Sequence, residues 1–380
     1  MQCEIKFHNN PKGYYNAGET IVGCAIITLP EKLSIQGIAF KVNGYGESKW
    51  PPKKQKKPKI DKKTGEIIDN SFHGREDYLS TVNFLLGSEK ALSIEMPPGK
   101  SFYDFQCTIP KNCPSSFEGQ HGHIRYEACL EIISPGNAII HTEGFTVSNI
   151  TENNIKAPHL MVPINMESSR SFCCKSGDVN LYMDLPKTGF VSGEEIPITV
   201  KVENNAGVYF KSLIFHFNQV IQYTSYQPKI QIKTSAFSLA DKNLILSGAA
   251  SRTMQGSLVI PEVPPTSEAF SKVIRISYEI SVIIETTRKK IIRSSVPVII
   301  GYEPVEITAP APRDTVDVQS IGSISSSMKY EESKFMKKVD ITDGDKHAKG
   351  KSTFAPKYPV FELDGIDQNN DEYDGELKKY

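Results

Sequence analysis

The stretch that decides the fold reads Pro114-Ser115-Ser116-Phe117-Glu118-Gly119-Gln120-His121-Gly122-His123-Ile124-Arg125-Tyr126, and it runs on through residues 127–133. A turn-rich opening that contains proline and glycine gives way to regular alternation of apolar and polar side chains. One face carries Ile124, Tyr126, Ala128, Leu130 and Ile132, and the other carries Arg125, Glu127, Cys129 and Glu131. This period of two predicts a half-buried β-strand that is entered from a turn.

The same arrangement returns later in the chain, where Pro264-Pro265-Thr266-Ser267 precedes the alternating run 274–282, and both strands carry a tyrosine. Earlier landmarks match in the same order. Tyr15-Asn16-Ala17-Gly18-Glu19 and Phe190-Val191-Ser192-Gly193-Glu194 each place an aromatic residue before a Gly-Glu turn. A second strand follows in each copy, at residues 35–42 and 211–217. The repeat is far longer than a solenoid unit and therefore predicts two domains of one architecture.

The spacing of the other strands indicates the type of domain. Alternating segments separated by Pro, Gly and Asn turns fill the first part of the chain, at residues 3–7, 20–29, 35–45, 78–86, 100–109, 124–133 and 139–147. Many short strands without a convincing helical stretch predict an antiparallel, immunoglobulin-like sandwich. We therefore predict an all-β protein with one sandwich at residues 1–150, a linker at 151–178, a second sandwich at 179–305 and a disordered, charge-rich tail at 306–380.

Overall composition limits the function classes. The chain has 380 residues with 44 Lys plus Arg and 44 Asp plus Glu, so its formal charge is zero and no global field recruits nucleic acid or an anionic membrane. Residues 1–6 lack the apolar core of a signal peptide, and no apolar run reaches the roughly 18 residues of a membrane-spanning helix. Seven cysteines are an odd count, which we interpret as reduced thiols. These features predict a soluble cytoplasmic protein.

A basic segment interrupts the first predicted sandwich between Trp50 and Asp77. It is the only part of the chain with a dense lysine cluster, and its members are Lys53, Lys54, Lys56, Lys57 and Lys59. A solvated loop explains the cluster. Contact with anionic lipid headgroups or with phosphorylated segments explains it too, as does a nuclear import signal on a structural scaffold.

Motifs for catalysis are absent from the sequence: there is no Gly-x-Ser-x-Gly elbow, no phosphate loop and no His-Glu-x-x-His. A metal-dependent or thiol enzyme would have to centre on Cys113, His121 and His123. The glycines beside these histidines favour a turn, and the adjacent Cys173-Cys174 pair is a poor chelator of one tetrahedral zinc. We therefore predict no enzyme, no metal and no cofactor, and keep the enzyme as the alternative.

Two motifs resemble a known family. Pro-Ser-Ser-Phe-Glu-Gly-x-x-Gly-x-Ile-Arg-Tyr at 114–126 is similar to the signature of the arrestin N-terminal domain in its α-arrestin, or arrestin domain-containing, form. The run from Leu185 to Glu194 is similar to the opening of the arrestin C-terminal domain. The signature residues, to which the resemblance assigns structural roles, are Phe117, Glu118, Gly119, Gly122, Arg125, Tyr126, Gly189, Gly193 and Glu194.

The resemblance covers residues 1 to about 305 and implies two arrestin-type sandwiches. It implies a non-enzymatic adaptor that binds membrane-protein cargo and couples it to endocytic sorting or ubiquitination, with peripheral association at the plasma membrane or endosomes. Relatives often carry Pro-Pro-x-Tyr motifs that dock WW domains of ubiquitin ligases. This tail offers only Ala355-Pro356-Lys357-Tyr358, so recruitment of a ligase by that route is in doubt.

The tail contains one further candidate motif. Tyr358-Pro359-Val360-Phe361 fits Tyr-x-x-Φ and resembles the sorting signal that clathrin adaptors bind, and Leu363 extends it toward a clathrin-box pattern. Peptides of this kind bind in an extended conformation, with alternate side chains in pockets. In a disordered tail Tyr358 and Phe361 would have no core to join, so we predict that they are available to clathrin adaptors.

Overall fold

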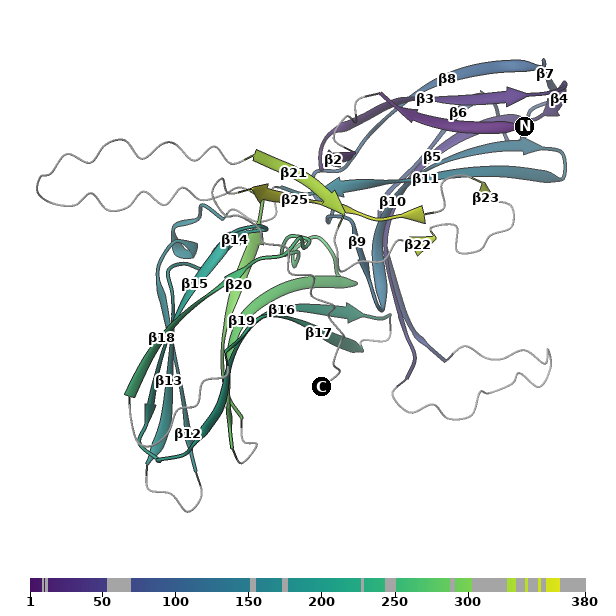
Figure 1. The fold of residues 1–380 in the computed structure, drawn as a ribbon. Helices are drawn as coiled ribbons and strands as arrows, with labels where there is room; N and C mark the ends of the chain where they lie inside the picture. The colour runs from purple at the N-terminus through teal and green to yellow at the C-terminus, as the bar shows by residue number, and fades with distance from the viewer. Residues whose placement is uncertain are drawn as a thin grey trace, which may run out of the picture.

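The computed structural model describes residues 1–8, 10, 13–52, 70–150, 155–172, 177–226, 229–242, 251–287, 291–302, 327–332, 339–340, 348–349 and 353–362. Within these residues the protein consists of strands and one short 3-10 helix, η1 (Pro158–Leu160). The strands form two sandwiches that meet at a central junction (Figure 1). The prediction of an all-β, tandem-sandwich protein is confirmed. No helix in the described part of the chain is long and apolar enough to span a membrane.

The N-terminal sandwich has two layers. The first is a sheet in the order β1-β3-β8, with β1 at Gln2–Phe7, β3 at Thr20–Leu29 and β8 at Gly99–Thr108. The second runs β2-β11-β10-β5-β6, with β2 at Tyr14–Asn16, β11 at Asn137–Ser148, β10 at Gly122–Ser134, β5 at Gly37–Trp50 and β6 at Phe72–Gly87. Short strands β4 (Leu33–Ile35), β7 (Ile94–Met96) and β9 (Phe117–Gly119) complete it. Phe40 from β5 stacks on Phe105 from β8 with ring centroids 3.8 Å apart, so the core lies between the layers.

The C-terminal sandwich repeats this plan. One layer runs β12-β13-β15-β18, with β12 at Ile164–Ser171, β13 at Asp178–Leu185, β15 at Glu195–Asn204 and β18 at Ser251–Val259. The other runs β14-β20-β19-β16-β17, with β14 at Gly189–Val191, β20 at Ile291–Gly301, β19 at Ile274–Thr286, β16 at Phe210–Thr224 and β17 at Ile230–Lys242. In both domains a three-residue strand pairs parallel with a long one, β2 with β11 and β14 with β20.

The proline turn and its tyrosine form the same hydrogen bonds in both domains. The Tyr126 hydroxyl donates to the Pro114 carbonyl at 2.6 Å, and the Tyr278 hydroxyl donates to the Pro264 carbonyl, also at 2.6 Å. Two residues after each proline, a hydroxyl accepts a backbone N–H of the neighbouring strand: Val147 donates to Ser116 and Ile300 to Thr266, both at 2.9 Å. A duplicated sequence pattern therefore corresponds to a duplicated corner of structure.

The Gly-Glu turns are also duplicated. Gly18 and Gly193 both have φ of 90°, a conformation in which a Cβ would be strained. The following glutamate then accepts a backbone N–H three residues back, from Asn16 to Glu19 at 2.8 Å and from Val191 to Glu194 at 3.1 Å. Both glutamates thus close the turn that feeds the next strand.

Loss of the corner hydroxyl has a measurable cost. Tyr126→Phe and Tyr278→Phe each leave a buried proline carbonyl without this donor, which should lower the free energy of unfolding by about 1–3 kcal/mol. Urea denaturation of each variant measures the effect. Tyr209→Phe is the matched control, because the Tyr209 side chain is largely exposed. Equal stability of all three variants would contradict a structural role for the corner.

Two segments differ from the sequence prediction. Residues 151–178 were predicted as linker, but β12 within them pairs antiparallel with β13 along its whole length and so belongs to the second sandwich.

Residues 306–380 were predicted to be disordered, but their described parts form strands: β21 (Ser327–Glu332), β22 (Val339–Asp340), β23 (Ala348–Lys349), β24 (Thr353–Phe354) and β25 (Lys357–Glu362). β21 and β25 pair antiparallel and lie across the junction (Figure 1). Composition alone does not predict this docking, because Tyr330 stacks on Tyr14 of the N-terminal sandwich and Tyr358 donates a hydrogen bond to the Ser116 carbonyl.

Candidate functional site

A buried ion pair lies beside the junction between the domains. Glu118 on β9 is paired in register with His123 on β10, which places the Glu118 carboxylate next to Arg125. Arg125 Nε donates to one Glu118 oxygen at 2.6 Å and Nη2 donates to the other at 3.1 Å. Both side chains are only 6% exposed. The bidentate geometry compensates part of the cost of taking two charges out of water.

Gly119 allows the second domain to approach closely. A Cβ at this position would lie 2.4 Å from the Tyr223 hydroxyl oxygen of β16, which is closer than atoms of two side chains can pack. The neighbouring His121 ring meets the Tyr223 ring edge-on, with centroids 5.5 Å apart. Gly122 has a different role, because a Cβ there would lie 2.2 Å from the Glu47 carbonyl of β5. One signature glycine therefore serves the domain contact and the other serves pairing within the sheet.

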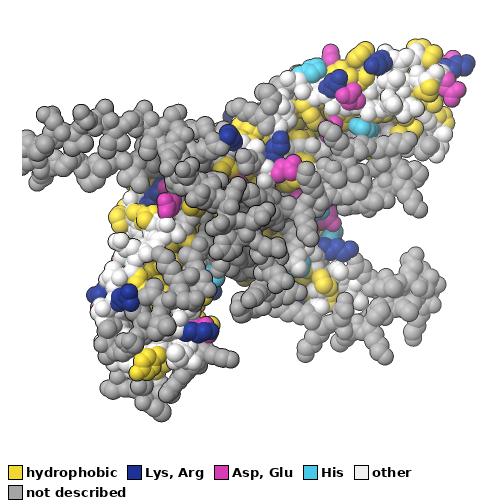
Figure 2. Space-filling model, viewed as in Figure 1, with side chains coloured by type: hydrophobic (Ala, Val, Ile, Leu, Met, Phe, Trp, Pro, Cys, Tyr) yellow, Lys and Arg dark blue, Asp and Glu magenta, His cyan; other side chains and the backbone are white. Residues whose placement is uncertain are grey.

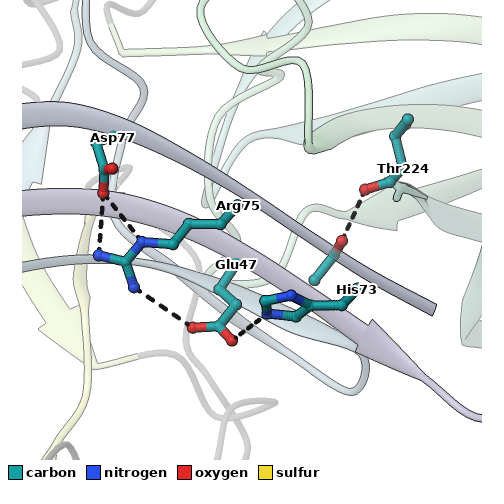
Figure 3. A network of polar contacts seen from close by, with 6 residues as sticks. Glu47, His73, Arg75, Asp77 and Thr224 are labelled. Carbon is teal, nitrogen blue, oxygen red and sulfur yellow. Dashed lines mark hydrogen bonds and ion pairs between the residues drawn. The ribbon is translucent and has the colours of Figure 1, made fainter. Parts of the chain in front are cut away.

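The long β5–β6 hairpin forms the rest of the contact between domains. Ser48 Oγ donates to the Thr224 carbonyl at 2.7 Å (Figure 3). The Tyr226 N–H donates to the His73 carbonyl at 2.9 Å. Further along β6, the hydroxyls of Tyr78 and Ser271 lie 2.8 Å apart. The interface between the domains is thus built from hydrogen bonds as well as packing, and it holds the sandwiches in one arrangement.

A charged network lies on the hairpin beside these contacts (Figure 3). His73 Nε2 lies 2.6 Å from Glu47 Oε1, and Arg75 lies between Glu47 and Asp77 while its guanidinium sits over the Tyr45 ring at 4.2 Å. Burial opposes ionisation of Glu47, but the hydrogen bond from His73 and the nearby positive charges outweigh it, so the Glu47 pKa is lowered. The network therefore keeps a carboxylate ionised at the end of the hairpin that contacts the second domain.

His123 links this network to the buried ion pair and makes folding sensitive to acid. Burial, together with the charge of Arg125, lowers the His123 pKa from 6.5 to about 4, despite the opposing effect of Glu47. Between these pH values the unfolded chain binds a proton that the folded chain does not, so stability is full above pH 6.5 and falls as the pH drops toward 4.

His123→Asn should make stability between pH 6.5 and 4 less dependent on pH, by on the order of 2 kcal/mol across the window. Thermal melts at several pH values measure this, with exposed His159→Asn as control; parallel pH profiles for wild type and His123→Asn would contradict it.

The tail docks against the same junction. The Tyr358 side chain is 1% exposed, and its hydroxyl donates to the Ser116 carbonyl at 3.2 Å. The Lys357 N–H donates to Thr146 Oγ1 at 3.2 Å, and the Tyr330 ring of β21 stacks on Tyr14 with centroids 3.4 Å apart. Our prediction that Tyr358 is freely available is therefore wrong for this conformation. A clathrin adaptor can contact its side chain only after β25 leaves the junction.

The other residues of the tail motif have varied surroundings. Pro359 is buried and Val360 is half-buried. Phe361 pairs through its backbone with Met328, and Leu363 lies outside the described residues. The lysines of the basic segment, Lys53, Lys54, Lys56, Lys57 and Lys59, also lie outside the described residues, so their proposed contact with lipid or phosphate stays a prediction.

The C-terminal signature contains a second ion pair. Lys187 Nζ lies 2.5 Å from Glu194 Oε1 and 5.0 Å from the centroid of the Phe190 ring, and its side chain is buried. Glu194 thereby joins the lysine to the turn that it closes. Gly189 pairs with Ile299 of β20 and packs beside Ile155. Sequence patterns identified Glu194 but missed Lys187, because its partner becomes apparent only when the turn is folded.

The residues of the alternative enzyme do not form a reaction centre in the described structure. The Cys113 thiol donates to the Pro110 carbonyl at 3.1 Å, His121 faces Tyr223, and His123 faces Tyr45 with ring centroids 5.7 Å apart. Among the described residues, no group of three or more His, Cys, Asp or Glu side chains could hold a metal ion. Burial raises the pKa of the Cys129 thiol to about 12, which makes it a poor nucleophile.

Figure 2 shows the charged side chains on one face of the molecule. Lys, Arg, Asp and Glu are mixed over the described parts of both sandwiches, without a large field of one sign on this face. At the junction, three features are buried: the Glu118–Arg125 pair, the Tyr223 contact and the docked Tyr358. Together they define a double-sandwich protein whose two domains and tail meet at one polar centre.

Comparison with known proteins identifies this class. The arrestin (or S-antigen) N-terminal domain matches residues 3–154, and the arrestin (or S-antigen) C-terminal domain matches residues 175–305. Arrestin domain-containing protein 17 of Caenorhabditis elegans is 28% identical over 366 residues, covering 90% of this chain and 81% of its own length. Arrestin domain-containing protein 4 of Mus musculus is 26% identical over 309 residues, 79% of this chain and 71% of its own. Human thioredoxin-interacting protein is 23% identical over 305 residues, 78% of this chain and 73% of its own. The chain belongs to the arrestin domain-containing, or α-arrestin, family.

Proposed function

We propose that this protein is a non-enzymatic adaptor that binds cytoplasmic segments of membrane proteins and couples them to endocytic sorting or ubiquitination. The observation that supports it most is the pair of arrestin domains, joined through a hydrogen-bonded junction. The junction holds the two sandwiches in a defined relative position. An adaptor that binds a partner through surfaces of both sandwiches depends on that position. The candidate residues for catalysis, Cys113, His121 and His123, lie in separate surroundings.

Coupling to sorting machinery is the finer part of this proposal. The tail motif at Tyr358 is one route, through clathrin adaptors, and it requires the docked strand to be released. Ubiquitin ligases are the other route, without a Pro-Pro-x-Tyr motif to recruit them. The adaptor would act at the cytoplasmic side of the plasma membrane or of endosomes, as a peripheral protein.

Surface proteomics tests the proposed function directly. Cells that lack the protein are surface-biotinylated and compared with cells that carry wild-type or Gly119→Leu protein. We expect a limited set of membrane proteins to accumulate at the surface without it and to return to normal only with wild type. A leucine at 119 would clash with the Tyr223 hydroxyl and with the Phe117 ring and so alter the contact between the domains, whereas exposed Tyr209→Leu serves as control. Unchanged surface levels in all cells, together with no binding of purified protein to any cytoplasmic segment, would refute an adaptor role.

A further inference from the structure

The site that holds Tyr358 has the properties of a peptide-binding site. We propose that the junction between the two sandwiches binds extended peptides that carry an unphosphorylated tyrosine beside a proline, and that residues 353–362 of the chain occupy it as a built-in ligand. This inference rests on the proposed adaptor function only for the source of the partner peptide, a cytoplasmic segment of a membrane protein.

The acceptor for the tyrosine hydroxyl is fixed by residues outside the tail. Ser116 donates its backbone N–H to the Val147 carbonyl at 2.9 Å and accepts the Val147 N–H on its side chain, also at 2.9 Å. These bonds hold the Ser116 carbonyl in place whether or not Tyr358 is bound to it. Next to it, the Ser115 and Tyr302 hydroxyls lie 3.1 Å apart and connect the two domains. The pocket is therefore a product of the sandwiches and is ready to accept a tyrosine hydroxyl.

Both domains contribute to the surroundings of the ring. Burial raises the pKa of Tyr358, and the groups that add to this effect are Tyr278 and Tyr302 from the C-terminal sandwich and Glu118 from the N-terminal one. An aromatic ring gains from leaving water here, while its hydroxyl keeps a hydrogen bond. Phenylalanine would fill the same space without that bond, so the pocket distinguishes tyrosine from phenylalanine.

The flanking residues determine the extended conformation of the ligand. Pro356 and Pro359 are both buried on either side of Tyr358. Proline restricts the backbone and disfavours helix in the residue before it, so a Pro-x-Tyr-Pro segment loses less conformational entropy on binding. One backbone N–H, that of Lys357, is satisfied by Thr146 Oγ1 of the N-terminal sandwich. The site therefore selects a short extended segment in which a tyrosine is adjacent to proline.

The same pocket should reject phosphotyrosine. A phosphate would place about two negative charges inside a buried site. The negative charge of Glu118 acts on Tyr358, and Arg125 already donates two hydrogen bonds to this glutamate. Burying the phosphate beside the Glu118 carboxylate is unfavourable both by repulsion and by loss of hydration. Phosphorylation of a bound peptide would then act as a release signal.

Fluorescence anisotropy on the full-length chain tests the proposal. The probe is a fluorescein-labelled peptide with the sequence of residues 353–364, and the proteins are wild type, Tyr358→Ala and Tyr209→Ala. In wild type the resident tail occupies the site, which reduces apparent affinity by the fraction of empty sites. We expect Tyr358→Ala to bind the probe at least tenfold more tightly than wild type or Tyr209→Ala. On Tyr358→Ala protein, a Tyr→Phe probe should bind about fivefold more weakly and a phosphotyrosine probe at least a hundredfold more weakly.

A second variant tests the proposal even if Tyr358→Ala does not fold. Tyr330→Ala removes the stack on Tyr14, which weakens the β21–β25 hairpin while the residues around Tyr358 stay unchanged. It should also bind the probe more tightly than wild type. Absence of binding to both variants, equal binding to all proteins, or equal binding of the phosphorylated probe would overturn the proposal. Because the probe comes from this chain, these results stand apart from the surface-proteomics test of adaptor function.

Discussion

Glu118→Gln is expected to lower the free energy of unfolding of the N-terminal domain by about 3–5 kcal/mol, because it leaves the Arg125 guanidinium buried without a counter-charge. The arginine side chain is only 6% exposed and cannot reach water without disrupting β10. Glutamine preserves the size of the side chain, so the effect reports on charge rather than on a cavity. Trp50, the single tryptophan, lies buried in the same domain and provides a fluorescence signal for its unfolding in urea.

The matched control for this change is Glu95→Gln. Glu95 pairs with Lys32 at 3.7 Å, but both side chains are largely exposed, and such a pair contributes about 0–1 kcal/mol. A loss of similar size in both variants, or no loss at Glu118, would show that the buried pair is not important for stability. Reversal of the pair, with arginine at 118 and glutamate at 125, should recover part of the loss if the interaction itself is responsible.

Tyr358→Ala is expected to release the tail from the junction. Truncation of a buried aromatic side chain costs about 3–5 kcal/mol, which corresponds to a fall of at least about a hundredfold in the protection of β25 amides against hydrogen exchange. The Lys357 amide, which donates to Thr146, is a direct probe of docking. Tyr209→Ala, at an exposed tyrosine, should leave this protection unchanged.

Docking of the tail also changes the expected effect of removing it. A disordered tail at residues 306–380, as its composition predicts, could be removed with little loss of stability. The burial of Tyr358 and the stack of Tyr330 on Tyr14 now predict that removal of residues 327–380 lowers the melting temperature. An unchanged melting temperature after this truncation, or unchanged amide protection in Tyr358→Ala, would show that the tail is only loosely associated.

Local sequence patterns predict which face of a strand is buried, but they do not predict which strands extend to the junction. The period-two pattern after Ile124 indicated which side chains of β10 face the core, and the structure confirms that Ile124, Tyr126 and Leu130 are buried. The strands β5 and β6 were expected to end near Tyr45 and to begin near Tyr78, but they extend to Trp50 and from Phe72. The additional residues contact the second domain, and no local pattern shows that this surface is covered.

The sequence by itself determined the duplicated plan: two sandwiches, proline corners closed by tyrosines, and Gly-Glu turns with glycine at positive φ. These features are local, because alternation sets the face of a strand and a turn depends on the few residues within it. Signature residues such as Glu118 and Arg125 were recognisable by their pattern, but nothing in that pattern showed that they form a buried pair.

Only the tertiary structure decided what meets at the junction. It brought Tyr223 against Gly119 and placed Tyr358 on a carbonyl 242 positions away in sequence. Each of these contacts joins surfaces that are complete only after the strands have folded. The free energy of burying a tyrosine depends on the pocket that receives it, and that pocket is formed by residues of both domains. The amino-acid composition of the tail therefore cannot predict this pocket.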